Sequence, residues 1–141
     1  MVLSADDQLD IASLLKRYVV ALDRFGERDI ATILSVFTED ATFSGPSGVF
    51  VGHDGIREWA SRNHATNQIR HIVSNLDVEG SDDRAELRAY FVVVGTETAV
   101  GDATVATSYL HQVGTYRCDA KRTAAGWRLS SRHVQLDGTA T

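Results

Sequence analysis

Near the start of the chain, apolar residues recur at intervals of three or four positions: Leu9, Ala12, Leu15, Val19 and Leu22. This spacing is typical of an amphipathic helix with one buried face. Ser4 and Asp7 resemble a capping box, and Gly26 is a typical residue just beyond a helix end. The pattern therefore predicts a first helix from about Ala5 to Phe25.

Two shorter helices and a hairpin are predicted next. Asp29 to Val36 carries apolar residues at helical spacing, and a third helix opens at Asp54 and ends near Ala65. Between these helices, the Gly-Pro-Ser-Gly segment 45–48 separates two short β-prone runs. Gly and Pro at such a junction favour a tight turn, so we expect a β-hairpin there.

Beyond residue 68 the pattern changes to a period of two residues, which is typical of strands. Four segments carry this pattern: Ile69 to Glu79, Arg84 to Thr98, Val105 to Lys121 and Trp127 to Leu136. Helices followed by strands are typical of an α+β protein. We therefore predict one domain, residues 1–141, in which three N-terminal helices cover a cone-shaped, curved antiparallel sheet.

The composition narrows the class of partner and the compartment. Hydrophobic residues make up 43% of the 141 residues, and the formal net charge is −5. This acidic balance argues against a nucleic-acid partner, because phosphate binding relies on clustered Lys and Arg. No apolar run approaches the roughly 20 residues of a membrane span, and the start of the chain lacks a signal-peptide pattern. Cys118 has no second cysteine to pair with, which fits a reducing compartment, so we expect a cytoplasmic protein.

Tyr18, Asp23 and His71 are the candidate catalytic residues. Asp23 lies five positions after Tyr18 on the first helix, and His71 opens the first long strand. A carboxylate bonded to one imidazole nitrogen fixes the tautomer and makes the other nitrogen usable as a general base near neutral pH. A tyrosine hydroxyl nearby could polarise a carbonyl or protonate a leaving group. These residues therefore indicate a proton-transfer site.

Each of the three residues also has a simpler structural interpretation. His71 could be a core histidine bonded to a backbone carbonyl, and Tyr18 could be a packing residue with a solvated hydroxyl. Asp23 could solvate the end of the helix. However, a carboxylate near a helix C-terminus is unfavourable to the helix dipole, so a further role for Asp23 is favoured.

Asn75 and three aromatic residues are candidates for substrate binding. Asn75 shares the alternating strand face of His71, so its amide could orient a substrate. Trp59, Phe43 and Tyr90 are expected in the core and the cavity wall. An apolar wall of this kind suits a small hydrophobic substrate, such as a cyclic compound.

Polar residues of the later strands have more than one interpretation. Arg132 alternates with Arg128, which favours a solvated strand face, while a role in binding an anionic substrate is the weaker alternative. His111 and Tyr109 alternate with Leu110 and could face the pocket, but an exposed or interfacial position fits equally well.

We expect no metal and no cofactor. A zinc site needs three or four His, Cys or acidic ligands from rigid elements. The remaining histidines share no ligand spacing: His53, His64, His111 and His133.

Several short motifs occur in order along nearly the whole chain: Tyr18-x4-Asp23, the segment Phe37 to Phe43, Gly52-His-Asp-Gly-Ile56, Arg70-His71-x3-Asn75, Gly114-x-Tyr116, and Gly126-Trp-Arg-Leu-x2-Arg132. Together they resemble the SnoaL-like family of the nuclear transport factor two-like superfamily. The resemblance implies the cone-shaped fold. It also implies that Asp23 and His71 correspond to the Asp–His pair of scytalone dehydratase, bile-acid dehydratase and lindane dehydrochlorinase types. Tyr18 occupies the position of the tyrosine that the dehydratases use.

Two classes of function remain open. The first is a cofactor-independent lyase or isomerase, most simply a dehydratase-like enzyme, in which His71 oriented by Asp23 removes a proton from a carbon beside a carbonyl. Cyclisation of a polyketide-like substrate uses the same enolate chemistry and is an alternative. The second class is a non-catalytic ligand-binding or assembly module, favoured if the cavity is filled or if Asp23 and His71 lie far apart.

A homodimer is also expected. The segment 104–113 carries apolar side chains on both strand faces, so a single covering layer of helices leaves one apolar face open. A second copy of the chain would cover that open face of the sheet.

Overall fold

The computed structural model describes residues 2–23, 28–62, 68–97, 101 and 106–139. It contains the helices α1 (Ala5–Leu22), α2 (Ile30–Val36) and α3 (Gly52–Arg62). The strands are β1 (Phe37–Gly45), β2 (Gly48–Val51), β3 (Gln68–Ser81), β4 (Arg84–Thr96), β5 (Ser108–Thr123) and β6 (Gly126–Thr139). They form one six-stranded curved sheet in the order β2-β1-β6-β5-β4-β3, in which β1 and β6 run parallel and the other neighbours antiparallel. The predicted α+β architecture is confirmed.

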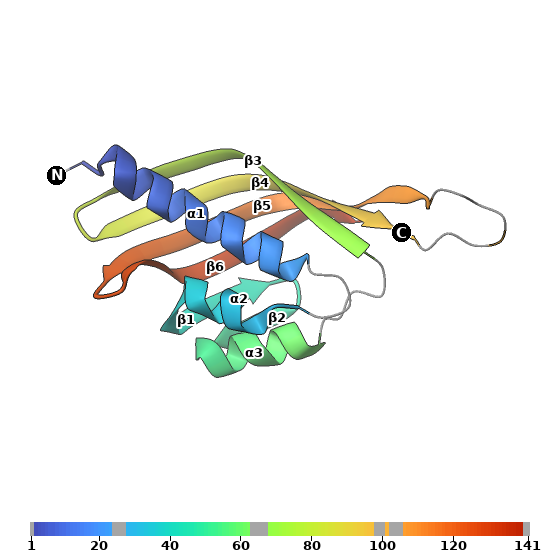
Figure 1. The fold of residues 1–141 in the computed structure, drawn as a ribbon, viewed down its shortest axis with the longest axis horizontal. Helices are drawn as coiled ribbons and strands as arrows, with labels where there is room; N and C mark the ends of the chain where they lie inside the picture. Colours follow the sequence, from blue (N-terminus) through green and yellow to red (C-terminus); the bar gives the residue numbers. More distant parts are fainter. Residues whose placement is uncertain (1, 24–27, 63–67, 98–100, 102–105, 140–141) are drawn as a thin grey trace.

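Helix α1 lies diagonally across one face of the sheet, with α2 and α3 beside β1 and β2 (Figure 1). The Ser4 hydroxyl accepts a hydrogen bond from the backbone N–H of Asp7 at 3.0 Å, as the capping pattern predicted. The predicted end near Phe25 is wrong, because the helix ends at Leu22 and Asp23 is its C-cap. The side chain of Asp23 bonds to β3 instead of facing solvent, which fixes this end of the helix. Gly26 lies outside the described residues.

The two short helices and the hairpin lie where the sequence predicted them. Asp29 caps α2 by accepting from both the backbone N–H and the hydroxyl of Thr32. Strands β1 and β2 close the hairpin through paired Gly45 and Gly48, and Gly48 has a φ of +116° that other residues rarely adopt. Helix α3 begins at Gly52, two residues before the predicted start, and its predicted end near Ala65 lies outside the described residues.

All four predicted long strands are present, but their pairing shifts register at four places, and two of these β-bulges change the predicted directions of candidate side chains. On β3 the extra residue lies between Ser74 and Asp77, which pair with Tyr90 and Arg88 of β4. On β6 it is Ser130, opposite the step from Asp119 to Ala120 of β5. A bulge moves every later side chain of its strand to the opposite face. The predicted ends of β4 and β5 at residues 98 and 105 lie outside the described residues.

The hydrophobic core lies between α1 and the concave face of the sheet. Its largest fully buried side chains include Tyr18, Phe43, Phe91, Leu87 and Leu129. Together they come from the first helix and from three strands, so burying the apolar stripe of α1 holds both layers together. Among the described residues, no helix combines the length and apolar character needed to cross a membrane.

The convex face of the sheet carries exposed apolar side chains. Ile72 on β3, Tyr90 on β4 and Leu110 on β5 are 55%, 58% and 57% exposed. These three strands are neighbours in the sheet. Such a face on a single chain is a candidate contact surface.

Candidate active site

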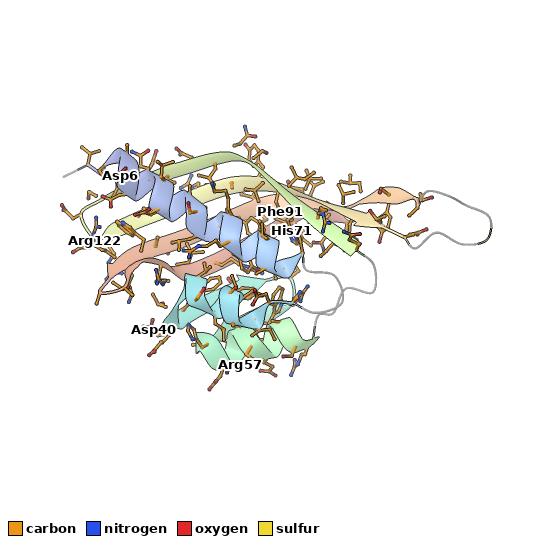
Figure 2. All side chains as sticks on the ribbon, in the orientation of Figure 1. Asp6, Asp40, Arg57, His71, Phe91 and Arg122 are labelled. Atoms are coloured by element: carbon orange, nitrogen blue, oxygen red, sulfur yellow. The ribbon has the colours of Figure 1, made fainter. Side chains whose placement is uncertain are left out.

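A cavity of about 290 Å³ opens near the C-terminal end of α1. Its lining comes from α1, α3, the hairpin and the strands β3 to β6, and includes the apolar side chains Leu22, Phe43, Phe50, Trp59, Ile69, Phe91, Val93 and Leu136. Figure 2 shows His71 and Phe91 close to the end of α1, and their ring centroids are 6.3 Å apart. The volume is near the lower end of ligand pockets, roughly 300–1,000 Å³, so it suits a small ligand.

Asp23 and His71 meet at this end of the helix. Oδ1 of Asp23 lies 2.5 Å from Nδ1 of His71, and Oδ2 accepts the backbone N–H of His71 at 2.8 Å. The contact of Oδ2 with the backbone N–H ties Asp23 to strand β3, while the contact of Oδ1 with Nδ1 orients the imidazole ring. An ionised carboxylate can only accept, so Nδ1 carries the proton and Nε2 is left as the acceptor. The two side chains are about one-tenth exposed, at 10% for His71 and 11% for Asp23.

The two residues face different spaces. His71 lines the cavity, whereas Asp23 lines a separate hollow on the outer side of α1, together with Lys16, Arg17 and Val20. Asp23 therefore reaches the cavity through the imidazole of His71. It can position His71, and His71 can contact a ligand.

Tyr18 lines the same cavity, one turn of α1 before Leu22. Its hydroxyl oxygen accepts a hydrogen bond from Nε of Arg132 at 2.9 Å. Burial raises the pKa of Tyr18, and the nearby Arg132 offsets part of that rise. The phenol therefore stays protonated, with its oxygen held by Arg132 and its own O–H available to donate.

Arg132 lies inside the fold, and the predicted solvated strand face is wrong. It is 5% exposed, and Nη1 also donates to the backbone carbonyl of Ser44 at 2.8 Å. The bulge at Ser130 is the physical reason, because it places Arg132 on the inner face although strict alternation would group it with Arg128. Arg132 instead lines the cavity, which is the position that the weaker alternative, a role in binding an anionic substrate, requires.

Aromatic rings surround the Arg132 guanidinium. Its central carbon lies 3.6 Å from the ring centroid of Phe43, 5.5 Å from that of Trp59 and 5.8 Å from that of Tyr18. Ring faces stabilise a cation that has been removed from water. Among the described residues, no carboxylate forms an ion pair with Arg132.

Arg28 also lines the cavity, and no sequence pattern predicts this position. It lies just before α2, and its guanidinium carbon is 4.9 Å from the Trp59 ring centroid. Its Nε and Nη1 atoms are buried and have no hydrogen-bond partner among the described residues. Burial lowers the pKa of Arg28. Arg28 belongs to none of the motifs and lies between helices, so its spacing gave no signal.

Two predicted substrate-binding residues lie outside the cavity. Asn75 lies at the bulge of β3, where it is exposed and has a φ of +52°. Leu76 occupies the inward position that strict alternation would give to Asn75. Tyr90 is on the convex face, because its neighbours Ala89 and Phe91 occupy the inner face of β4. Both expectations are corrected.

Other candidate side chains divide between the cavity and the framework. Trp59 and Phe43 line the cavity as predicted, and His111 of β5 lines it too, which favours the pocket over the exposed alternative. His53 has a structural role, since its Nε2 lies 3.0 Å from the backbone carbonyl of Phe37. Burial raises the pKa of Cys118 to about 12, so its thiol stays protonated and is a poor nucleophile.

The fold is shared with several solved structures. A protein of unknown function with a cystatin-like fold from Nostoc punctiforme is 24% identical, with a TM-score of 0.80 over 97% of this chain and 96% of that chain. A candidate aromatic ring hydroxylase from Novosphingobium aromaticivorans is 29% identical, with a TM-score of 0.78 over 99% of this chain and 94% of that one. A candidate scytalone dehydratase from the same organism is 18% identical, with a TM-score of 0.76 over 97% and 91%.

The sequence comparisons agree with the structural ones. The SnoaL-like domain family matches residues 4–133. No curated protein matches the chain significantly. The family match therefore covers every candidate site residue from Tyr18 to Arg132.

Proposed function

The chain belongs to the SnoaL-like domain family, as its motifs predicted, and on this premise we propose that it is a cofactor-independent lyase or isomerase of the dehydratase type. Its substrate is a small hydrophobic ring compound that carries a carbonyl or another activating group. The contact between Asp23 and His71, with Nε2 of His71 left free beside the cavity, is the observation that carries the proposal.

The reaction begins with His71. Nε2 removes a proton from the carbon next to the carbonyl, and the electron pair of that C–H bond forms an enolate. Asp23 accepts from Nδ1–H throughout and stabilises the imidazolium that forms. The apolar walls exclude water, which strengthens each hydrogen bond inside the cavity.

Tyr18 completes the reaction. Its O–H donates a hydrogen bond to the enolate oxygen or to the departing hydroxyl group. In a dehydration the imidazolium of His71 gives its proton to that hydroxyl, the C–O bond breaks as the double bond forms, and water leaves with both side chains restored. Arg132 holds the phenol oxygen and so directs the proton of Tyr18 toward the ligand. In an isomerisation, the imidazolium of His71 returns its proton to another carbon of the same substrate.

A panel of hydroxylated ring ketones tests this function. Loss of water is followed by mass spectrometry and by the absorbance of the new conjugated double bond. We expect turnover with the wild type and a loss of about 1,000-fold with His71→Ala. The matched control is His133→Ala, which removes an exposed histidine whose ring contacts Ser44. Full activity of a folded His71→Ala variant would exclude the proposed mechanism.

The structure supports the two alternative functions, a cyclase and a non-catalytic module, to different degrees. A cyclase that uses the same enolate remains compatible with the site, and adding linear polyketide-like ketones to the panel separates it from a dehydratase. A non-catalytic module is the less favoured alternative, because the cavity is open and Asp23 contacts His71.

We also propose that two copies of the chain associate through the convex sheet face around Ile72, Tyr90 and Leu110. Light scattering at micromolar concentration should then give the mass of a dimer. Tyr90→Glu should shift the protein toward monomer, because it places a charge in an apolar contact. Val49→Glu, at an exposed position on β2, is the control. A monomeric wild type would contradict this proposal.

A further inference from the structure

The cavity holds two arginines, and their positions are related through one indole ring. The guanidinium carbon of Arg28 is 4.9 Å from the Trp59 ring centroid, and that of Arg132 is 5.5 Å from it. Both residues line the same cavity as His71. Two positively charged side chains of the cavity lining therefore contact the same indole ring.

No acid of the described chain forms an ion pair with either arginine, although the charge of Asp23 acts on Arg28 from a distance. Neither arginine forms an ion pair with a described carboxylate, and Asp23 uses both oxygens to bond His71. The aromatic rings around Arg132 account for the burial of that cation, but Arg28 keeps two buried donor nitrogens without partners. Buried polar groups in proteins are nearly always paired, so unpaired donors beside a cavity indicate a missing acceptor.

We propose that Arg28 and Arg132 bind a carboxylate group of the ligand, so that the natural substrate or product is a small cyclic carboxylic acid. The reaction that this carboxylic acid undergoes rests on the proposed function. Its binding to the two arginines does not. The planar donor forks of the two guanidinium groups match the two oxygens of a carboxylate. The Trp59 and Phe43 rings then pack on the ring of the ligand, and its far side faces His71.

The free N–H groups fit this arrangement. Arg132 spends Nε on Tyr18 and one N–H of Nη1 on Ser44, which leaves Nη2 for the ligand. Arg28 offers Nη2, which is not among its fully buried nitrogens, while Nε and Nη1 reach the ligand only if the side chain shifts on binding. A single charged group between two arginines also fixes the orientation of the ring, which a purely apolar cavity cannot do.

Isothermal titration calorimetry with benzoate and its uncharged analogue benzamide tests the proposal, in buffer of low chloride at pH 7. We expect benzoate to bind the wild type at least about 10-fold more tightly than benzamide. Arg28→Gln should weaken benzoate by about 10-fold and leave benzamide unchanged. The matched control Arg57→Gln removes an exposed arginine of α3 that pairs with Asp54, and it should bind benzoate like the wild type.

The outcomes separate this inference from the proposed function. His71→Ala should keep the preference for benzoate over benzamide, because His71 faces the ring and not the carboxylate. Equal affinity for benzoate and benzamide, or unchanged benzoate binding by Arg28→Gln, would overturn the carboxylate site even if His71 proves essential for turnover. Conversely, selective benzoate binding with no turnover of any ring ketone would retain the site and reject the dehydratase function.

Discussion

Helix α1 carries an aspartate at each end, and each one ties the helix to the sheet, but the two contacts differ in kind. Asp7 in the first turn contacts Arg122 and Trp127, whereas Asp23 at the C-cap contacts His71. The same type of side chain therefore anchors the helix at its N-terminal end and forms part of a candidate site at its C-terminal end. The difference lies in the partner and in what surrounds it.

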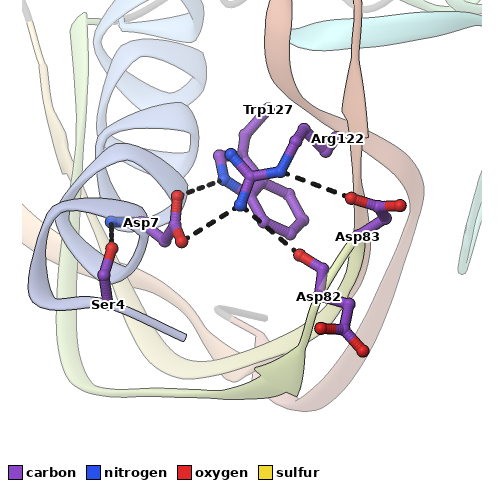
Figure 3. Close-up of polar contacts among 6 residues, drawn as sticks. All are labelled: Ser4, Asp7, Asp82, Asp83, Arg122 and Trp127. Carbon is purple, nitrogen blue, oxygen red and sulfur yellow. Dashed lines mark hydrogen bonds and ion pairs between the residues drawn. The ribbon is translucent and has the colours of Figure 1, made fainter. Parts of the chain in front are cut away.

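The Asp7 end has the features of a structural contact. Its carboxylate accepts from Nη2 of Arg122 at 3.0 Å and from Nε1 of Trp127 at 3.0 Å (Figure 3). Arg122 also contacts Asp82 and Asp83 in the β3–β4 turn. The hydrogen bond from Arg122 holds the pKa of Asp7 well below its usual range. An acid in the first turn also suits the positive end of the helix dipole, so the hydrogen bonds and the dipole together favour the charged form of Asp7.

The Asp23 end has the opposite character. A carboxylate at the last turn is unfavourable to the helix dipole, and its partner is the imidazole ring of His71. The partner also lines a cavity, while the Asp7 cluster has no part in that cavity. An acid at the unfavourable end of a helix, bonded to an imidazole beside a cavity, is typical of a functional site.

The largest expected difference between the two ends is in turnover. Asp23→Asn keeps the size of the side chain and one acceptor oxygen, but it removes the charge that holds Nδ1–H of His71. We expect kcat to fall by roughly 100-fold. Asp7→Asn is the matched control and should retain the turnover of the wild type. Equal effects of the two substitutions on kcat would remove the distinction between the ends.

A smaller loss is expected for Tyr18→Phe. The substitution removes one hydroxyl and leaves His71 and Asp23 in place, so kcat should fall by about 10-fold. The Nε atom of Arg132 loses its acceptor, so the thermal unfolding midpoint should fall as well. Tyr90→Phe, on the convex face, controls for loss of a hydroxyl elsewhere. A kcat equal to that of the wild type would limit Tyr18 to a packing role.

At the Asp7 end of α1, substitution should lower the stability of the protein and leave its turnover unchanged. Asp7→Asn weakens the contact with Arg122, so its thermal midpoint at pH 7 should lie below that of the wild type. Circular dichroism during heating measures the midpoint. Asp54→Asn, which also removes an acid bonded to an arginine, is the exposed control and should change the midpoint less. A midpoint equal to that of the wild type would show that the cluster in Figure 3 does not anchor the helix.

The last and smallest effect is the pH dependence of that stability difference. The pKa of Asp7 is lower in the folded protein than its reference value of 3.8. Its contribution is therefore fully present above about pH 3.8 and is lost as the pH falls through the lower folded value. The midpoints of the wild type and Asp7→Asn should differ at pH 7 and converge toward pH 2. A gap that stays constant with pH would contradict the charged contact.

The local pattern of apolar, turn-forming and capping residues was enough to predict most of the helices and strands. Apolar spacing predicted α1 to within its last turn, the Gly-Pro-Ser-Gly segment predicted the hairpin, and the change of period predicted the four long strands. It also singled out Asp23, because an acid at the unfavourable end of a helix needs a reason. These features depend on residues a few positions apart, which the sequence contains directly.

The tertiary structure alone decided that Asn75 lies outside the cavity and that Arg132 and Arg28 line it. The bulge on β3 turned Asn75 outward and the bulge on β6 turned Arg132 inward, against the alternation that the sequence predicts. A bulge depends on how one strand pairs with the next, which no local pattern encodes. Arg28 reaches the cavity only because α2 and α3 pack it against Trp59. The sequence thus determined the elements and the Asp–His pair, whereas strand register and helix packing determined the charge that the pair faces.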